Sequence, residues 1–450
     1  MAKREYGKEH PFYKLGPFKV RLPFIHYRWE WPEAIQALLM CSTCLGAIPI
    51  LTEVLGVPFE IAWSMVIING FLYSLHALLG DPVVPGWITP AVPLITAFLG
   101  NYAIGAERIQ ALIAVQLLVS LIFLFMGLTG LASKLMGIIP NSIKAGILLG
   151  AGVAAVIGEF QVGGRFGVYP ISITVGAILA YFILFSNGFI ALKKKSKILT
   201  IIGKYGMVSA IIIAVILGPI VAEIPMPQIE IGSVIKLPDF AGLIKTVSPF
   251  GVGFPALKLF ITAIPMAIIA YIIAFGDFIT TEALIGESMK KRPDEFIDFN
   301  SNRSNLISGI RNFIMALIAP YTQLCGPLWA AVTAAVAQRY EEGREDMDTI
   351  YSGAGTFRIM TFIGVSLVPI VSLLEPVLPI ALSLTLLVQG YICTRLAMSI
   401  CKTDTERGIA GVMGAVLAAK GAAWGLVIGI ILYFVLTDFS KNKEKVKVNN

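Results

Sequence analysis

The chain has 450 residues, of which 56% are apolar and only 14% carry a charge. Soluble domains are about 45–50% apolar and about 25% charged, so the composition excludes a soluble enzyme and a nucleic-acid-binding protein and predicts an integral membrane protein. The net charge of +7 at pH 7 therefore bears on orientation in the bilayer and not on binding to a polyanion.

The sequence predicts about fourteen apolar spans, separated at prolines, glycines and charge clusters. The first half contains spans near 33–55, 58–79, 86–100, 107–128, 140–159, 168–186 and 204–222. The second half contains spans near 256–283, 304–319, 326–340, 351–373, 376–399, 406–420 and 421–438. The third and tenth are too short to cross a hydrocarbon core of about 30 Å as single helices.

Charge then assigns the two faces. An even number of spans puts both termini on one side, and the lysine- and arginine-rich clusters at 193–197 and 290–292 fall on that side, which the positive-inside bias makes cytoplasmic. The first thirty residues have no features of a signal peptide. We expect a multi-pass protein of the cell membrane with these parts: a cytoplasmic N-terminal segment (1–30), a first repeat (31–222), an extracellular linker loop (223–255), a second repeat (256–438) and a cytoplasmic tail (439–450).

Each half holds seven spans, an odd number, so the second half enters the membrane in the opposite orientation. That arrangement is typical of inverted-repeat transporters. The short spans occupy corresponding places: 80–98 contains Thr89-Pro90 and 319–337 contains Gly326-Pro327, each followed by an apolar run. A capping residue followed by proline at the first helical position is typical of the start of a helix. Because non-helical backbone at membrane depth is tolerated only inside protein or along a cavity, the two breaks predict the solute site; two ordinary proline kinks are the alternative.

The candidate binding residues surround these helix starts. Free backbone N–H groups at helix N-termini suit an anion or carbonyl oxygens, and two tryptophans beside them could stack on a planar solute or simply pack. The candidates at the breaks are Trp87, Thr89, Pro90, Ala91, Gly326, Pro327, Leu328 and Trp329. Polar side chains that could add hydrogen bonds, or only pack helices together, are Gln36, Ser42, Thr43, Thr322 and Gln323.

Ionisable residues within apolar spans complete the set, because they usually face a cavity or a partner. Asp277 lies deepest and is predicted to bind the solute and carry the coupling proton, unless a lysine or arginine neutralises it; Glu282 is the second acid. His76 has no visible partner and is expected to be structural. Arg311, Arg358 and Arg395 are expected to neutralise acids or to extend to the cytoplasmic edge of the membrane, and Arg358 could instead hold helices of the core domain together.

Three stretches resemble the nucleobase/ascorbate permeases, the uracil and xanthine permease family. Residues 35–51 resemble the family's opening helix, with Gln36 at its glutamine; 138–156 resemble its fifth span; 299–320 resemble the ninth span it shares with sulfate permeases. The resemblance implies an all-helical fold of two inverted seven-span repeats. It also implies a core domain from spans 1–4 and 8–11, which carries the solute, and a gate domain from spans 5–7 and 12–14, which often forms a homodimer.

The sequence also departs from that family. Ala37 stands where the family has histidine, and Pro327 follows Gly326 where the family has a polar or acidic residue that binds the base. We expect a proton-coupled (alternatively sodium-coupled) symporter of a nucleobase such as uracil or xanthine, working by alternating access. The alternatives are a sulfate-permease-like anion carrier without a regulatory domain, and a passive anion channel or facilitator. No enzyme, cofactor or metal motif is present, so the expected partners are the solute, the coupling ion, lipid and a second copy, with no nucleic acid.

Overall fold

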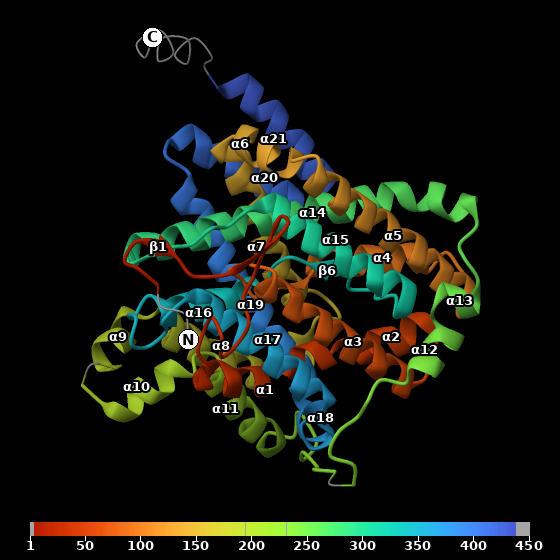
Figure 1. The fold of residues 1–450 in the computed structure, drawn as a ribbon, viewed down its shortest axis with the longest axis horizontal. Helices are drawn as coiled ribbons and strands as arrows, with labels where there is room; N and C mark the ends of the chain where they lie inside the picture. Colours follow the sequence, from red (N-terminus) through yellow and green to blue (C-terminus); the bar gives the residue numbers. More distant parts are fainter. Residues whose placement is uncertain (1–3, 194, 231, 438–450) are drawn as a thin grey trace.

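The computed structural model describes residues 4–193, 195–230 and 232–437, and nearly all of its regular structure is helical (Figure 1). Within those ranges, six helices are long and apolar enough to cross a membrane, or seven if the bent pair of helices over 170–193 counts as one span. The chain is therefore a multi-span membrane protein. The predicted tail, 439–450, lies outside the described residues.

The elements follow the predicted spans closely. The helices of the first half are α1 (Trp31–Leu45), α2 (Ala47–Leu55), α3 (Phe59–Leu78), η1 (Thr89–Ala91), α4 (Val92–Leu99), α5 (Ala106–Leu128), α6 (Leu131–Ile138), α7 (Asn141–Phe160), η2 (Arg165–Gly167), α8 (Pro170–Phe185), α9 (Asn187–Lys193), α10 (Lys197–Lys204) and α11 (Val208–Ile220). Those of the second half are α12 (Phe240–Thr246), α13 (Pro249–Val252), α14 (Leu257–Lys291), α15 (Ser301–Ile318), α16 (Ala330–Tyr340), α17 (Ile350–Ser366), α18 (Val368–Leu374), η3 (Glu375–Val377), α19 (Leu378–Ile400), α20 (Asp404–Lys420) and α21 (Ala422–Leu436). The strands are β1 (Lys8–Glu9), β2 (Tyr13–Leu15), β3 (Phe18–Val20), β4 (Gly86–Trp87), β5 (Glu295–Phe296) and β6 (Cys325–Gly326).

Two predicted span ends differ most from the structure. The eighth span continues to Lys291, and the eleventh, predicted to reach 373, ends at Ser366. Pro369 is the cause of the second difference, because proline has no N–H to continue the helix and instead occupies the first turn of α18.

The inverted repeat is visible in which helices pack together. If α1–α2, α3, α4, α5, α7, α8 and α11 correspond in order to α14, α15, α16, α17, α19, α20 and α21, the most extensive helix contacts have mirror contacts. Helix α5 packs on α15 as α17 packs on α3, α14 packs on α5 as α1 packs on α17, and α7 packs on α20 as α19 packs on α8. Strands β4 and β6 pair antiparallel, as a two-fold axis between equivalent segments requires. The predicted fold of two inverted repeats with broken third and tenth spans is confirmed.

The helices form two groups, which we call the first bundle (α1–α5 and α14–α17) and the second bundle (α7, α8, α11 and α19–α21). At the centre of the second bundle α7 crosses α19 at a glycine pair: a Cβ on Gly152 would lie 2.8 Å from the Gly390 carbonyl oxygen, and one on Gly390 would lie 3.0 Å from that of Gly152. Because the hydrophobic effect does not drive helices together inside a bilayer, close packing must do so, and glycines allow the two backbones to approach this closely.

The N-terminal segment is folded and not a free basic arm. Strands β2 and β3 form a hairpin, β1 pairs in parallel with β5, and Arg4 contacts Asp294 at 2.6 Å and Glu295 at 3.0 Å. This segment lies at the same end of the molecule as α9 and α10, on the left in Figure 1, whereas α12 and α13 lie at the right. We call these the N-terminal end and the opposite end.

Candidate functional site

The two broken spans meet at the β4–β6 crossing, where Gly86 pairs with Gly326 and Trp87 with Cys325. A Cβ on Gly86 would lie 2.6 Å from the Leu328 carbonyl oxygen, and one on Gly326 would lie 2.6 Å from the Trp87 carbonyl carbon. Both obstacles are backbone atoms, so both positions require glycine. The structure thereby corrects the reading of Gly326 as a helix cap: it lies in β6, and α16 begins later, at Ala330.

The irregular backbone at this crossing is held by hydrogen bonds, as buried backbone at membrane depth requires. The Trp329 N–H donates to the Val84 carbonyl at 2.6 Å, and the Ile88 N–H donates to the Gln323 carbonyl at 3.1 Å. The Asn312 side chain accepts from the Cys325 N–H at 3.0 Å and donates to the Cys325 carbonyl at 2.9 Å. The crossing is therefore a rigid, prearranged element.

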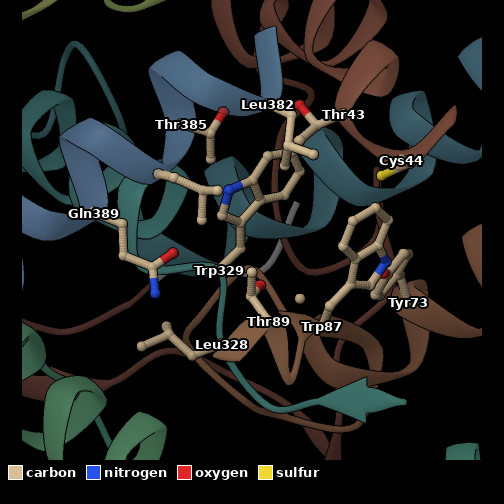
Figure 2. Close-up of a pocket in the computed structure, with 12 residues that line it drawn as sticks. Thr43, Cys44, Tyr73, Trp87, Thr89, Leu328, Trp329, Leu382, Thr385 and Gln389 are labelled. Carbon is tan, nitrogen blue, oxygen red and sulfur yellow. The ribbon is translucent and has the colours of Figure 1, made fainter. Parts of the chain in front are cut away.

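A cavity of about 30 Å³ lies against this crossing, where one water occupies roughly 10–15 Å³ on this measure. Its walls come from both bundles and contain no acidic residue. They are formed by Thr43, Cys44, Tyr73, Gly86, Trp87, Thr89, Leu328, Trp329, Leu382, Thr385, Leu386 and Gln389. Figure 2 shows Trp329 in the middle, with Thr385 and Gln389 of α19 on one side and Trp87 and Tyr73 on the other.

Helix α16 starts at this cavity, because its N-cap Trp329 and the preceding Leu328 are wall residues. The N–H groups of its first turn have no partner within the helix and mark its positive end. On the other broken span, η1 begins at Thr89 without a side-chain cap, and Pro90 at its start has no N–H to offer. The electropositive contribution of the backbone is therefore larger from the tenth span than from the third.

A larger cavity of about 470 Å³ continues from the first and shares five wall residues with it: Trp87, Thr89, Leu382, Leu386 and Gln389. It runs along the end of α7 to the Glu159–Arg165 ion pair. This cavity, which we call the vestibule, leads toward the opposite end, because Ile50 of α2 and Val92 of α4 also line it and both helices lie on the right in Figure 1.

Two buried arginines stand behind the small cavity. Arg358 of α17 and Arg311 of α15 are both fully buried, and their guanidinium carbons lie 4.0 Å and 4.6 Å from the centroid of the Tyr73 ring. Arg358 also lies 5.1 Å from the Trp329 ring centroid. Among the described residues, Arg358 forms no ion pair, and its side-chain nitrogens have no oxygen acceptor; the Cys44 thiol lies beside its guanidinium. We call this group the arginine stack (Arg311, Tyr73 and Arg358).

Arg311 is tied to its surroundings more firmly than Arg358. Its Nη1 donates to the Gly326 carbonyl at 3.0 Å and lies 3.0 Å from His76 Nε2. His76 Nδ1 in turn lies 2.7 Å from Asp81 Oδ2, with both side chains fully buried. The expectation that His76 has no partner is wrong, because Asp81 follows five residues later and the chain turns back between them.

The structure brings some predicted site residues together and separates others. Trp87, Thr89 and Leu328 line the cavity, whereas Ala91, Gln323, Gly326 and Pro327 are buried in or beside the crossing without lining it. The side chain of Pro90 lies outside the described part of the structure. Gln36 is buried elsewhere, with its amide nitrogen 3.6 Å from where a Gly206 Cβ would stand.

The two predicted acids do not line the cavity. Asp277 is partly buried on α14, next to Gly276, which faces Ile147 of α7, and close to Cys393 of α19. It has no ion-pair partner among the described residues, and it lies where the two bundles meet. The side chain of Glu282 is 53% exposed and pairs with Lys144 at 3.2 Å. Solvent exposure and this ion pair explain how its charge is accommodated, without a bound solute.

The sequence reasoning did not single out Tyr73, Thr385 or Gln389 as wall residues. A lone tyrosine or threonine in an apolar span is usually a packing residue, so nothing in the sequence marked them. Arg358 did carry a signal, as a charge inside an apolar span, but its position behind the cavity follows only from the packing of α17 against α1 and α3. In the described residues, no group of three or more His, Cys, Asp or Glu side chains could hold a metal ion.

Comparison with known proteins finds similarity only among solved structures. No protein-family model and no curated protein matches the sequence. The transmembrane domain of the cyanobacterial bicarbonate transporter BicA is 14% identical, with a TM-score of 0.47 over 89% of this chain and 97% of that one. SLC26A9 gives 14% identity and a TM-score of 0.48 over 91% of this chain and 66% of that one. The murine Solute Carrier 26 family member A9 anion transporter, in the inward-facing state, is 14% identical in sequence. Its TM-score is 0.45, over 95% of this chain and 70% of that one.

Proposed function

We propose that the chain is a secondary transporter of a small anion in the cell membrane, working by alternating access. This is the anion-carrier alternative of the sequence analysis, and it takes precedence over the nucleobase. The observation that carries it is the arginine stack, which places two buried guanidinium groups behind the cavity.

The charge of the stack is what calls for an anion. A buried charge without a partner costs several kcal/mol, so buried charges are normally paired. Among the described residues, the acid that contacts this group is Asp81, and it reaches Arg311 through His76. Arg358 has no such partner. An anion in the cavity, beside the start of α16, would supply the missing negative charge.

The dimensions of the cavity favour a small solute. Its volume of about 30 Å³ corresponds to roughly two waters, which suits an inorganic anion or a small carboxylate better than a purine or pyrimidine ring. The nucleobase stays the second candidate on one observation: Trp87 and Trp329, which could stack on a ring, both line the cavity. No acidic wall residue is present to bind the ring nitrogens.

One-sided access supports a carrier and not a channel. Toward the N-terminal end two ion pairs join the bundles, Glu287–Arg395 at 3.0 Å and Glu282–Lys144 at 3.2 Å. Glu342, just after α16, also pairs with Lys193 of α9. Toward the opposite end the vestibule reaches the small cavity. In this proposal the first bundle is the core domain that carries the solute, the second bundle is the gate domain through which two copies associate, and both termini are cytoplasmic.

The solute is tested by exchange in proteoliposomes loaded with sulfate, bicarbonate, a small dicarboxylate, uracil or xanthine. We expect at least one anion to exchange and to be stimulated by the same anion on the far side, because a carrier returns faster when loaded. Uracil or xanthine uptake without exchange of any anion would overturn the proposal. Anion flux without this stimulation would replace the carrier with a channel.

Proton coupling through Asp277 remains a prediction. The carboxyl lies where the bundles meet and lacks an ion-pair partner among the described residues, so a change of its charge would act on the boundary that must move. Asp277→Asn should abolish accumulation driven by a proton gradient while leaving exchange intact. Glu282→Gln, on the same helix but half exposed, is the matched control. Unchanged accumulation in Asp277→Asn would remove that residue from the coupling.

A further inference from the structure

The His76–Asp81–Arg311 chain has a feature that transport of an anion alone does not explain. All three side chains are fully buried, and they come from the end of α3, the turn after it and the middle of α15. Arg311 joins this chain to both parts of the site, because its Nη1 also donates to the Gly326 carbonyl in β6 and its guanidinium lies on the Tyr73 ring.

The hydrogen bonds define the protonation state of His76. A guanidinium has only donors, so at 3.0 Å from Arg311 Nη1 the His76 Nε2 must accept. The single ring proton therefore sits on Nδ1 and is donated to Asp81 Oδ2 at 2.7 Å. In this structure His76 is neutral: its Nε2 accepts from Arg311, and its Nδ1 donates to Asp81 Oδ2.

A second proton on His76 would break this arrangement. Protonated Nε2 cannot accept, and an imidazolium beside a guanidinium is repelled by it, so the Arg311–His76 contact would be lost. Asp81 can stay in place, because its contact with Nδ1 becomes an ion pair. Among the described residues, Nε and Nη2 of Arg311 have no hydrogen-bond partner, so loss of the His76 contact would leave Arg311 held there mainly by the bond from its Nη1 to the Gly326 carbonyl.

We infer that His76 is a second proton-binding residue, which makes anion binding depend on pH, whereas Asp277 would act on the movement of the two bundles. Asp81 and Arg311 are its positioning residues, and the inference rests on the proposed anion site. Protonation adds one positive charge next to the arginine stack and releases Arg311 from its neutral acceptor. Both changes favour an anion in the cavity. Because coupling between two ligands is reciprocal, the bound anion favours the proton equally, which is what a proton–anion symporter requires.

The surroundings of His76 leave it as the group on which a proton can act. The charged groups facing the His76–Asp81 pair from the packed elements are Arg311 and Arg303 of α15, Arg358 of α17 and Arg21 of the N-terminal segment. The titratable groups Tyr73 of α3, Cys44 of α1 and Cys325 of β6 lie against Arg311 and Arg358. The arginines stay protonated. The proton must therefore go to the imidazole or its carboxylate partner.

Equilibrium binding of sulfate and bicarbonate to the purified full-length protein tests the inference, by calorimetry between pH 5 and 8. In wild type, the anion affinity should rise as the pH falls, approaching about tenfold per pH unit if one proton is taken up per anion. His76→Gln keeps an acceptor for Arg311 and a donor for Asp81 but cannot titrate, so it should still bind the anion, with an affinity independent of pH. His26→Gln, which changes a histidine of the N-terminal segment, should keep the wild-type profile.

Each outcome decides the inference. A wild-type pH profile retained in His76→Gln overturns it, as does a profile abolished by Asp277→Asn but not by His76→Gln, since coupling would then reside in Asp277. Anion binding in wild type that is independent of pH also overturns it while leaving the anion site standing. Absence of binding by either anion at every pH is the distinct failure of the proposed function, and the inference falls with it.

Discussion

Replacing Arg358 by methionine separates the two contributions of this side chain. Arg358 is fully buried and forms no ion pair within the described part of the chain, and methionine fills a similar volume without charge. We expect Arg358→Met to weaken anion binding and, at the same time, to stabilise the anion-free protein. Replacement of buried ionic groups by packed apolar side chains can stabilise a protein by about 1–4 kcal/mol.

The size of the binding effect follows from the geometry. The guanidinium carbon lies 4.0 Å from the Tyr73 ring centroid and 5.1 Å from that of Trp329, and both rings line the cavity. An anion on the far side of these rings would be about 7 Å away, where two unit charges at an effective dielectric constant of about 20 attract by about 2.4 kcal/mol. The affinity should therefore fall by about 50-fold.

Calorimetric titration with the transported anion measures this loss, and thermal unfolding in detergent without added anion measures the stability. Arg344→Met is the matched control, since Arg344 is 47% exposed and pairs with Asp348, and it should change neither quantity much. An anion affinity within twofold of wild type in Arg358→Met would refute the reasoning that its charge acts on the cavity.

Three further predictions concern the crossing, the ion pairs and the N-terminal segment. Gly326→Ala should lower the free energy of unfolding by about 1–3 kcal/mol and abolish transport, because the added Cβ would lie 2.6 Å from backbone atoms. Gly411→Ala, where nothing lies within 4 Å of the added Cβ, should melt and transport as wild type does. Equal melting temperatures for Gly326→Ala and wild type would contradict the close approach. Arg395→Glu should shift the protein toward opening at the N-terminal end, measured as a faster rate of thiol labelling there, and adding Glu287→Arg should reverse the shift. Exposed ion pairs contribute about 0.2–1 kcal/mol, so the labelling rate should rise by up to about fivefold. A double variant whose labelling rate does not return toward wild type would argue against the ion pair. Burial lowers the pKa of His10 from 6.5 to about 4. Between these pH values the unfolded chain binds more protons than the folded chain, so stability falls as the pH drops from about 6.5 toward 4. His10→Asn should flatten that part of the profile of melting temperature against pH, and an unchanged slope would contradict the burial argument.

The spans and their inverted arrangement were predictable because long apolar runs carry a strong signal and their parity dictates orientation. The position of the crossing, where we propose that the solute binds, was also predictable, since Thr89-Pro90 and Gly326-Pro327 interrupt apolar sequence at matching places. The sequence does not reveal the role of Gly326, because a close approach to Trp87 depends on a segment more than two hundred residues away in the chain.

The chemistry of the site was less predictable than its location. Asp277 is the conspicuous acid in the sequence, yet the structure places it at the bundle boundary and puts two arginines behind the cavity instead. Arg311 and His76 are 235 residues apart and meet only because α15 packs on α3. Such pairings need the tertiary fold, and a single sequence contains no local pattern for them.

The central claim is that an anion binds at the β4–β6 crossing in front of Arg358. Anomalous diffraction from crystals soaked in bromide tests it most directly, because bromide is a small anion that can be located by its own scattering. The account predicts a bromide peak in the cavity bounded by Trp87, Thr89 and Trp329, which disappears in Arg358→Met. Bromide peaks confined to the protein surface, with none at the crossing, would contradict it.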